Sequence, residues 1–185
     1  MIDINALRQD LSEFECLYEA ESKDKKAMLS LLDTPKPFDR SQFDPGHFTG
    51  SAFVLSPKLD AILLIFHEKL KLWLQPGGHV DPEDPSMLAA AARELSEETG
   101  VTQPLMHPKV QGPLAIDIHV IPARKTEPEH LHFDIRYLFI APDTHIKAAS
   151  DALDARWVAF DAVDTLKTDD SVLNTVRRIQ HLLSA

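Results

Sequence analysis

The chain has 185 residues, a length that suits one substantial hydrophobic core with an added terminal segment and is short for two domains. Hydrophobic residues make up 44% and charged residues 26%, and these near-average values exclude a disordered or fibrous protein. The formal net charge of -10, without a dense run of Lys or Arg, excludes a general affinity for long polyanions such as nucleic acids.

The N-terminal segment is predicted to be helical. Apolar residues recur at helical spacing over residues 2–32, which predicts two helices with the charged residues 21–26 between them and Ser22 as a cap. Residues 33–37 contain two prolines and are expected to end the second helix, and the chain through Gly46 is predicted to be a linker. These helices either cover a sheet or form a homodimer surface, and packing within the chain is the favoured interpretation.

Cys16 is the only cysteine and lies among apolar neighbours in this segment. A structural thiol is favoured over a nucleophile, because no base lies near it in the sequence. One cysteine excludes an internal disulfide and fits a reducing compartment. Because the N-terminus shows no secretory signal and the apolar runs are too short to span a bilayer, we expect a cytoplasmic protein without a membrane partner.

From Thr49 onward the pattern changes to short apolar runs. Residues 51–55 and 61–66 are predicted strands joined by a turn, and residues 70–74 are a third candidate strand. After a proline-interrupted acidic loop, residues 86–99 are rich in strong helix formers and are followed by Gly100, which predicts a helix that ends there.

The second half of the chain is predicted to continue with strands and to close with a helix. Residues 115–121 and 131–140 alternate in side-chain type, as strands do, and residues 156–160 are another candidate strand. Residues 169–183 carry apolar side chains at helical intervals and are expected to form an amphipathic helix.

Three carboxylates share one stripe of the helix predicted over residues 86–99. A rotation of about 100° per residue places Glu94, Glu97 and Glu98 within roughly a third of its circumference. A bound cation such as Mg²⁺ or Mn²⁺ would relieve their mutual repulsion, and Arg93, one turn before Glu97, is placed to hold that carboxylate. A solvated charged face is the alternative for an isolated cluster of this kind.

The stretch from Gly77 to Asp84, followed by residues 91–101, resembles the Nudix box. In that family the second half reads Arg-Glu-aliphatic-any-Glu-Glu-any-Gly-aliphatic, and residues 93–101 match every fixed position. The first half departs from the pattern: an aspartate stands where glutamate is usual, and the gap to Arg93 is one residue longer. Either Asp84 or Glu83 is therefore expected to brace the box arginine.

The resemblance implies an α/β fold, a Nudix-type α/β/α sandwich with a mixed sheet, that covers about residues 48–160. Residues 1–47 would then be an N-terminal helical extension packed on the core, and residues 48–185 the Nudix domain with its C-terminal helix. The implied reaction is metal-dependent hydrolysis of the pyrophosphate bond in a nucleoside diphosphate linked to another moiety. ADP-ribose, a nucleotide sugar, a dinucleotide and a non-standard nucleoside triphosphate are the candidate substrates.

The resemblance also implies roles for the residues of the box. Glu97 and Glu98 would be the principal ligands of Mg²⁺, for which Mn²⁺ can substitute. Glu94 would be a further ligand or the base, and the Gly78 carbonyl would complete the coordination. Arg93 is expected to order these acids. Chemically, the cation would neutralise the diphosphate and lower the pKa of a bound water.

A second polar cluster follows from strand alternation. His130, His132, Asp134 and Arg136 fall on one face of a predicted strand, and Asp117 and His119 share a face of the preceding one. An ordinary exposed face, a wall of substrate contacts and a metal site at the His-any-His spacing are three open interpretations. Arg136 is the best phosphate candidate, because its guanidinium can make bidentate contacts.

Two further residues are candidates for substrate contact. His79 follows the paired glycines and is expected either to touch a phosphate or to be a simple loop histidine. Trp73, with Phe66, could stack on a base, and ordinary core packing is the favoured alternative.

Two other functions remain open from the sequence. The irregular first half of the box motivates a catalytically inactive nucleotide-binding or regulatory Nudix-like domain. Isomerisation of an isoprenoid diphosphate uses a related fold but usually a cysteine in the pocket, and Cys16 lies outside the resembling region.

Overall fold

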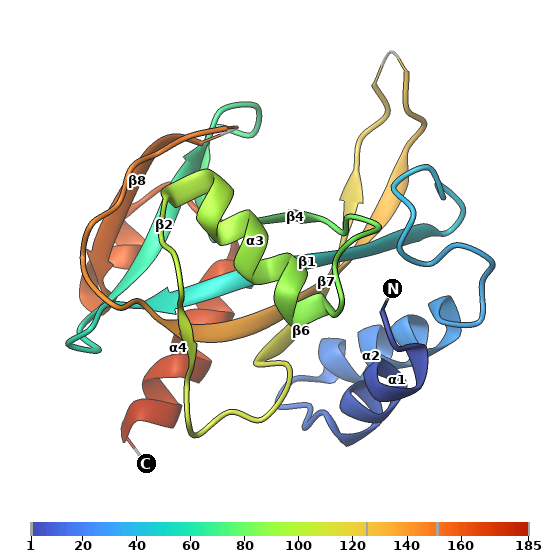
Figure 1. Cartoon of the computed structure of the whole chain (residues 1–185), viewed down its shortest axis with the longest axis horizontal. Helices are drawn as coiled ribbons and strands as arrows, with labels where there is room; N and C mark the ends of the chain where they lie inside the picture. Colours follow the sequence, from blue (N-terminus) through green and yellow to red (C-terminus); the bar gives the residue numbers. More distant parts are fainter. Residues whose placement is uncertain (1, 125, 151, 185) are drawn as a thin grey trace.

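The computed structural model describes residues 2–124, 126–150 and 152–184, and a mixed eight-stranded sheet lies at its centre (Figure 1). The strands are β1 (Gly46–Leu55), β2 (Ala61–His67), β3 (Leu72–Leu74), β4 (Gly77–His79), β5 (Leu105–Met106), β6 (Ala115–Ile121), β7 (His130–Ile140) and β8 (Ala152–Ala159). The helices are α1 (Ile4–Glu13), α2 (Glu19–Leu31), α3 (Met87–Thr99) and α4 (Asp170–Ser184), with a short 3₁₀ helix, η1 (Phe160–Thr165).

Helices cover both faces of the sheet, so the predicted α/β/α sandwich is confirmed (Figure 1). Because side chains alternate along a strand, each strand of the sheet contributes to two separate cores. Phe48 and Ala52 of β1 belong to the core under α1, α2 and α3, whereas Phe53 and Leu55 belong to the core under α4.

The two N-terminal helices are confirmed, but the predicted break between them is wrong. The break spans residues 14–18, and the charged residues 21–26 lie inside α2. Tyr18, not Ser22, is the N-cap. The physical reason is Glu21, whose carboxylate accepts hydrogen bonds from the backbone N–H groups of Leu17 and Tyr18, so this charged stretch starts a helix instead of separating two.

The strands differ from the prediction mainly at their ends. The predicted linker through Gly46 is too long, because β1 already starts at Gly46 and pairs in parallel with β7 over its whole length. Hydrogen bonds to this distant partner keep the polar first half of β1 extended. β8 begins at Ala152, earlier than predicted, and β3 is shorter than residues 70–74. β4 and β5 were not predicted, since they are too short to show periodicity.

Helix α3 begins one residue later than predicted and ends at Thr99 as predicted, and local chemistry explains both ends. The Ser86 hydroxyl accepts a hydrogen bond from Ala89 N at 3.1 Å, and Gly100 ends the helix at φ 72°. Gly50 of β1 allows the helix to lie close to the sheet. A Cβ there would be 3.2 Å from Met87 O and 3.3 Å from Ala91 N.

The N-terminal helices pack against the sheet within the chain. Leu11 and Met28 are fully buried and belong to the same hydrophobic cluster as the core strands. Arg178 of α4 donates hydrogen bonds to the Glu21 carboxylate at 2.7 Å and the Glu15 carbonyl at 2.6 Å. Cys16 is partly buried against this cluster.

Candidate active site

The carboxylates of α3 lie against the paired glycines of β4. Glu98 is buried, and its Oε2 accepts a hydrogen bond from Gly77 N at 3.0 Å. A Cβ added at Gly78 would lie 2.6–2.7 Å from the carboxylate atoms of Glu94. Only glycine therefore leaves room at this position for the Glu94 carboxylate to approach the strand.

Arg93 holds the acidic side chains of the loop and the helix in fixed positions. Its Nη1 donates to Glu94 Oε1 at 3.0 Å and to Glu97 Oε2 at 3.2 Å. Its Nη2 donates to Asp84 Oδ2 at 3.0 Å and to the His79 carbonyl at 2.8 Å. One guanidinium thus ties the helix to both the loop and β4.

Asp84, and not Glu83, is the loop carboxylate that contacts this arginine. Asp84 is buried, whereas Glu83 is exposed. Besides receiving bonds from Arg93, Asp84 accepts one from Asp81 N at 2.8 Å, which fixes the loop. The choice that the sequence left open is decided by this loop conformation.

Burial and ion pairing act in opposite directions on the charges of the site. Burial raises the pKa of Glu94 above its ordinary value, and the hydrogen bond and charge of Arg93 offset part of the rise. Burial alone would lower the pKa of Arg93, but hydrogen bonds to Asp84 and Glu94 raise it, so the guanidinium stays charged. Glu97 is more exposed, with 53% of its side chain accessible.

A cavity of about 790 Å³ joins this acidic cluster to the predicted polar strand face. Glu94, Glu98, Gly78 and His79 line it together with His119, His130, His132, Asp134 and Arg136. Three basic side chains that the sequence analysis missed, those of Arg40, Lys69 and Arg124, also line the cavity. They come from three separate loops, so no sequence motif links them. Cations beside carboxylates are suited to a phosphate ligand and its metal ion.

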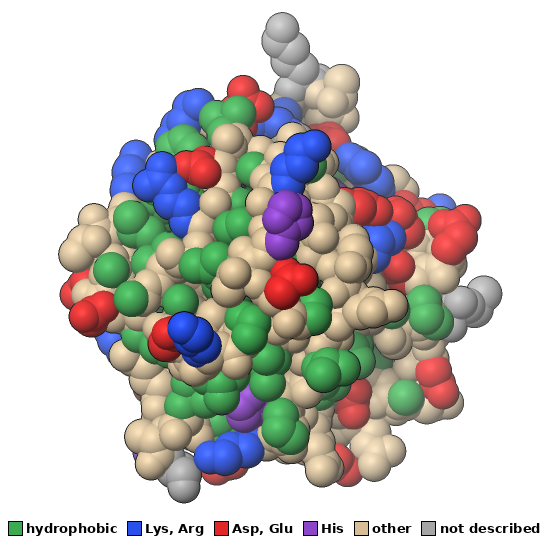
Figure 2. All heavy atoms as spheres, turned by 60° about the vertical axis from the view of Figure 1, so that its left-hand side comes forward, with side chains coloured by type: hydrophobic (Ala, Val, Ile, Leu, Met, Phe, Trp, Pro, Cys, Tyr) green, Lys and Arg blue, Asp and Glu red, His purple; other side chains and the backbone are tan. Residues whose placement is uncertain are grey.

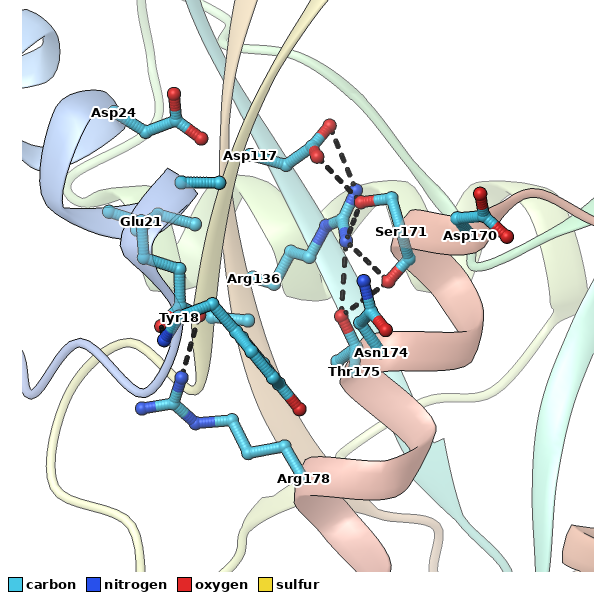
Figure 3. Close-up of a pocket in the computed structure, with 13 residues that line it drawn as sticks. Tyr18, Glu21, Asp24, Asp117, Arg136, Asp170, Ser171, Asn174, Thr175 and Arg178 are labelled. Carbon is cyan, nitrogen blue, oxygen red and sulfur yellow. Dashed lines mark hydrogen bonds and ion pairs between the residues drawn. The ribbon is translucent and has the colours of Figure 1, made fainter.

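Arg136 and Asp134 of β7 form a buried hydrogen-bond network at the wall of this cavity. Asp134 accepts hydrogen bonds from Ser51 Oγ at 2.7 Å and from Arg136 Nε at 2.9 Å. The Arg136 side chain is 4% exposed, and Figure 3 shows its guanidinium pointing toward Asp117 of β6 and toward Ser171 of α4. These contacts join four elements, β1, β6, β7 and α4, and they direct much of the hydrogen-bonding capacity of Arg136 to protein groups.

Five histidine rings lie close together along this side of the cavity. The rings of His47, His79 and His130 lie 4.8–5.2 Å from that of His132, measured between centroids. His119 follows at 5.5 Å. His47 was not predicted as a site residue. The parallel pairing of β1 with β7 places it beside His132, and that pairing is the feature that would have identified it.

The cluster contains both neutral and charge-stabilised imidazoles. Burial lowers the pKa of His132 to about 2 and that of His79 to about 4, so both rings are neutral at pH 7. Burial also acts to lower the pKa of His119, but the hydrogen bond with Asp117 at 2.9 Å and nearby acids raise it overall.

The structure separates Trp73 from the other predicted substrate residues. Its ring packs on Phe66 at 5.4 Å and under the guanidinium of Arg156 at 4.8 Å, and it belongs to the core beneath α4. Trp73 is absent from the described lining of the cavity. This arrangement favours core packing, the alternative weighed from the sequence.

The molecular surface mixes charges of both signs. On the face shown in Figure 2, Lys and Arg side chains are interspersed with acidic and hydrophobic ones and form no continuous stripe. Within the described part of the chain, no helix combines the length and the apolar character that crossing a membrane requires.

Comparisons with known proteins point to one family. A family model described as the NUDIX domain matches residues 47–177. The NUDIX domain of Shewanella oneidensis NrtR, solved with ADP ribose, is similar at 20% identity and a TM-score of 0.58, over 81% of this chain and 93% of that one. No curated protein sequence matches the chain significantly.

Two further solved structures share the fold. The C. elegans Ap4A hydrolase is 17% identical with a TM-score of 0.56, and the match covers 74% of this chain and 97% of that one. The E. coli dihydroneopterin triphosphate pyrophosphohydrolase is 14% identical with a TM-score of 0.53, over 75% and 96% of the two chains.

Proposed function

The chain belongs to the NUDIX family and is a Nudix hydrolase by family and fold, and from this premise we propose that it hydrolyses the pyrophosphate bond of a nucleoside diphosphate linked to another moiety. The observation that carries the proposal is the position of Glu94 and Glu98, which line one cavity together with the basic side chains of Arg40, Lys69 and Arg124. Such a cavity suits an anionic substrate that arrives with a divalent cation.

The candidate substrates are ADP-ribose, a nucleotide sugar, a dinucleotide and a non-standard nucleoside triphosphate. ADP ribose is the ligand of the similar NrtR domain, and Ap4A gives its name to the similar hydrolase. Both compounds contain phosphoanhydride bonds between a nucleoside and a second group, which supports this class of substrate.

The donor set at α3 fits Mg²⁺, with Mn²⁺ as a substitute. Glu94, Glu97 and Glu98 offer carboxylate oxygens, the Gly78 carbonyl offers another hard oxygen, and the absence of a Cβ at Gly78 leaves the Glu94 carboxylate its place beside the strand. When bound, the cation supplies charge neutralisation of the diphosphate and activation of water.

The residues of the chain itself have distinct proposed tasks. Arg93 is a positioning residue that keeps Glu94 and Glu97 in single orientations. Glu94, whose pKa is raised by burial, is the further ligand or the base that accepts a proton from water. The basic side chains of the cavity would hold the phosphate groups.

The polar side chains of β6 and β7 in the cavity, together with His79, are proposed to contact the remainder of the substrate. His79, His119, His130 and His132 line the cavity with polar nitrogens, and Asp134 and Arg136 line it from the buried network. Trp73 remains a proposed base-stacking residue only if the substrate reaches beyond the cavity.

Turnover of the candidate substrates with Mg²⁺ tests the proposal. We expect one class to be cleaved at the pyrophosphate bond. Glu97→Gln and Glu98→Gln should each lower kcat/KM by more than the roughly 10–100-fold that loss of an outer contact costs. Glu19→Gln, at an exposed glutamate of α2, is the matched control and should leave turnover unchanged. Unchanged turnover in both site variants would refute the mechanism.

The same experiment separates the catalytic proposal from the alternative of an inactive nucleotide-binding or regulatory domain. Tight nucleotide binding by calorimetry without product after long incubation would favour that alternative. Multiple turnover would exclude it. Product analysis with isopentenyl diphosphate tests isomerisation in the same way.

We further propose a cytoplasmic location, to be tested by fractionation of cells that express the full chain. A homodimer formed through the N-terminal helices is the alternative to a monomer. Sedimentation of the purified protein decides between these states.

A further inference from the structure

Three histidines from two neighbouring strands converge outside the carboxylate cluster of α3. His47 of β1 and His132 of β7 are Cα partners in the parallel pair, and His130 lies two residues before His132 on the same strand face. One side-chain nitrogen from each ring lies within 4.8 Å of those of the other two. His47 is fully buried and His130 is 5% exposed, so the ordinary exposed face weighed from the sequence does not describe His130.

Backbone carbonyls fix which nitrogen of two rings carries the proton. The Nδ1 of His47 lies 3.1 Å from the Gln42 carbonyl, and the Nδ1 of His130 lies 2.8 Å from the Pro128 carbonyl. A carbonyl oxygen only accepts hydrogen bonds, so each Nδ1 is the donor and each Nε2 has a free lone pair. Histidine ligands of metal ions commonly show this second bond from the opposite ring nitrogen.

Two ring nitrogens of this group have no protein partner. His47 Nε2 and His132 Nε2 are buried without a hydrogen-bond partner among the described residues. Buried polar atoms are nearly always satisfied, because an unpaired one loses its interaction with water and gains nothing in return. Two such atoms in one cluster therefore indicate a ligand that accepts electron pairs from nitrogen.

We propose that the Nε2 atoms of His47, His130 and His132 bind a divalent transition-metal ion of the zinc class, at a site separate from the one proposed for Mg²⁺ at α3. Imidazole nitrogen favours Zn²⁺ and related ions, whereas Mg²⁺ favours oxygen, so the two clusters select different metals. In a tetrahedral site with Zn–N bonds of about 2.0–2.1 Å the nitrogens lie roughly 3.4 Å apart. Binding therefore requires the rings to rotate so that nitrogens now within 4.8 Å of one another reach this spacing.

The fourth position of this site lies toward the substrate cavity. His130 and His132 line the cavity, and His47 does not. Three histidines with one open position are the arrangement of zinc sites that bind water or a substrate group. The His79 ring, whose centroid is 5.1 Å from that of His132, lies close enough to bind or cover the metal at that position. The metal would thus form part of the cavity wall to which His130 and His132 contribute.

Direct metal binding tests the proposal without any assay of activity. The full chain, stripped with a chelator, is incubated with Zn²⁺ in excess Mg²⁺, and the retained metal is measured by mass spectrometry after gel filtration. Co²⁺ replaces Zn²⁺ in a parallel sample, in which the visible absorption reports nitrogen ligands. We expect about one Zn²⁺ per chain, displaced by neither Mg²⁺ nor Mn²⁺.

Substitutions then locate the site. His130→Ala and His132→Ala should each weaken Zn²⁺ binding at least tenfold and abolish the Co²⁺ absorption. His145→Ala, at an exposed histidine after β7, and Glu98→Gln should retain both. Since a substitution in the cluster can unfold the chain, a Zn²⁺-dependent rise in the melting temperature of the unmodified protein is measured as well.

Some outcomes would overturn this assignment. In the first, the unmodified protein retains no more Zn²⁺ than a blank without protein, and its melting temperature does not change when Zn²⁺ is added. Another is loss of Zn²⁺ in Glu98→Gln but not in His132→Ala, which would mean adventitious binding to the carboxylates. Hydrolysis by zinc-free protein with Mg²⁺ alone is measured separately, so failure of the zinc site leaves the proposed hydrolase function standing, and the reverse also holds.

Discussion

At the scale of single residues, Arg93 holds the acidic side chains of α3 in place. Glu94 and Glu97 would repel each other on a bare helix, and the arginine compensates this repulsion by contacting both. Its own position depends on Asp84, a buried loop carboxylate. The fixed arginine thus holds the carboxylates of Glu94, Glu97 and Asp84 in defined orientations.

The role of Asp84 can be tested against its neighbour in the chain. Asp84→Ala removes the acceptor of Arg93 Nε and Nη2, so we expect Glu94 and Glu97 to lose their fixed orientation and kcat/KM to fall about 10–100-fold. Glu83→Ala, at the adjacent exposed acid, should leave kcat/KM close to the original value. Equal losses in the two variants would show that Asp84 does not hold the arginine.

Asp117 gives the fold a dependence on pH. Burial alone would raise its pKa, but the hydrogen bond from His119 and the charge of Arg136 lower it below the ordinary value of 3.8. A carboxyl group whose pKa is lower in the folded state stabilises the fold above its unfolded pKa, and this contribution disappears as the pH falls through the folded pKa.

We therefore expect Asp117→Asn to lower the free energy of unfolding by about 1–3 kcal/mol at pH 7 and by progressively less below pH 4. Urea denaturation at a series of pH values, down to the lowest at which both proteins remain folded, measures the difference. The exposed Asp161→Asn serves as control. A difference that stays constant between pH 7 and pH 3 would contradict the assignment.

At the scale of elements, the three-residue strand β4 connects the two halves of the site. It pairs with β1, and Gly77 N donates a hydrogen bond to the Glu98 carboxylate of α3. A Cβ at Gly77 would meet the backbone of Ser51 at 2.7 Å, so the pairing itself requires a residue without a side chain. The strand conformation of β4 depends on its pairing with β1, because three residues are too few to show a periodic pattern.

Gly78→Ala should affect activity more than stability. The new methyl group would meet the end of the flexible Glu94 side chain, which can move aside, so we expect the melting temperature to change little. The displaced carboxylate should lower kcat by about 100-fold. Circular dichroism melting and turnover with Mg²⁺ measure the two effects.

Gly100→Ala provides the opposite result as a control. There is room for a methyl group, with the nearest atom at 3.9 Å, but φ is 72°. The strained backbone should cost about 1 kcal/mol of stability, while turnover per folded molecule remains unchanged. If Gly78→Ala instead loses stability and keeps its activity, Glu94 does not need its place beside β4.

At the scale of the whole molecule, helices from the two ends of the chain are joined beside strand β6. Arg178 of α4 contacts Glu21 of α2, 157 residues away, and its guanidinium lies 4.9 Å from the ring centroid of Phe14. A cavity of about 280 Å³ lies beside this junction, lined by residues of α2, β6 and α4 (Figure 3). The N-terminal helices are therefore fastened to the domain by buried charge as well as by apolar packing.

Arg178→Ala should destabilise the fold by about 3 kcal/mol, because it leaves the largely buried Glu21 carboxylate without its cation. Arg177→Ala is the matched control: this neighbour is exposed and bonds to Asn174, so we expect a change of about 0.5 kcal/mol or less. Chemical denaturation measures both. Similar values for the two variants would show that the Glu21 pair contributes nothing to the junction.

The sequence by itself determined the features that depend on near neighbours in the chain. The extent of α3 and its end at Gly100 follow from hydrogen bonds that span a few residues, and so does the contact of Arg93 with Glu97. The family resemblance followed from the same local pattern. These predictions were confirmed because a helix contains its own hydrogen-bond partners.

Only the tertiary structure decided which distant groups meet. The start of β1 at Gly46, the pairing of His47 with His132 and the hydrogen bond from Thr49 to Asp134, 85 residues apart, depend on strand register. Likewise, packing in the core beneath α4 keeps Trp73 out of the described lining of the cavity. A strand finds its hydrogen-bond partners elsewhere in the chain, so the spacing of its own residues shows a face but not what that face will contact.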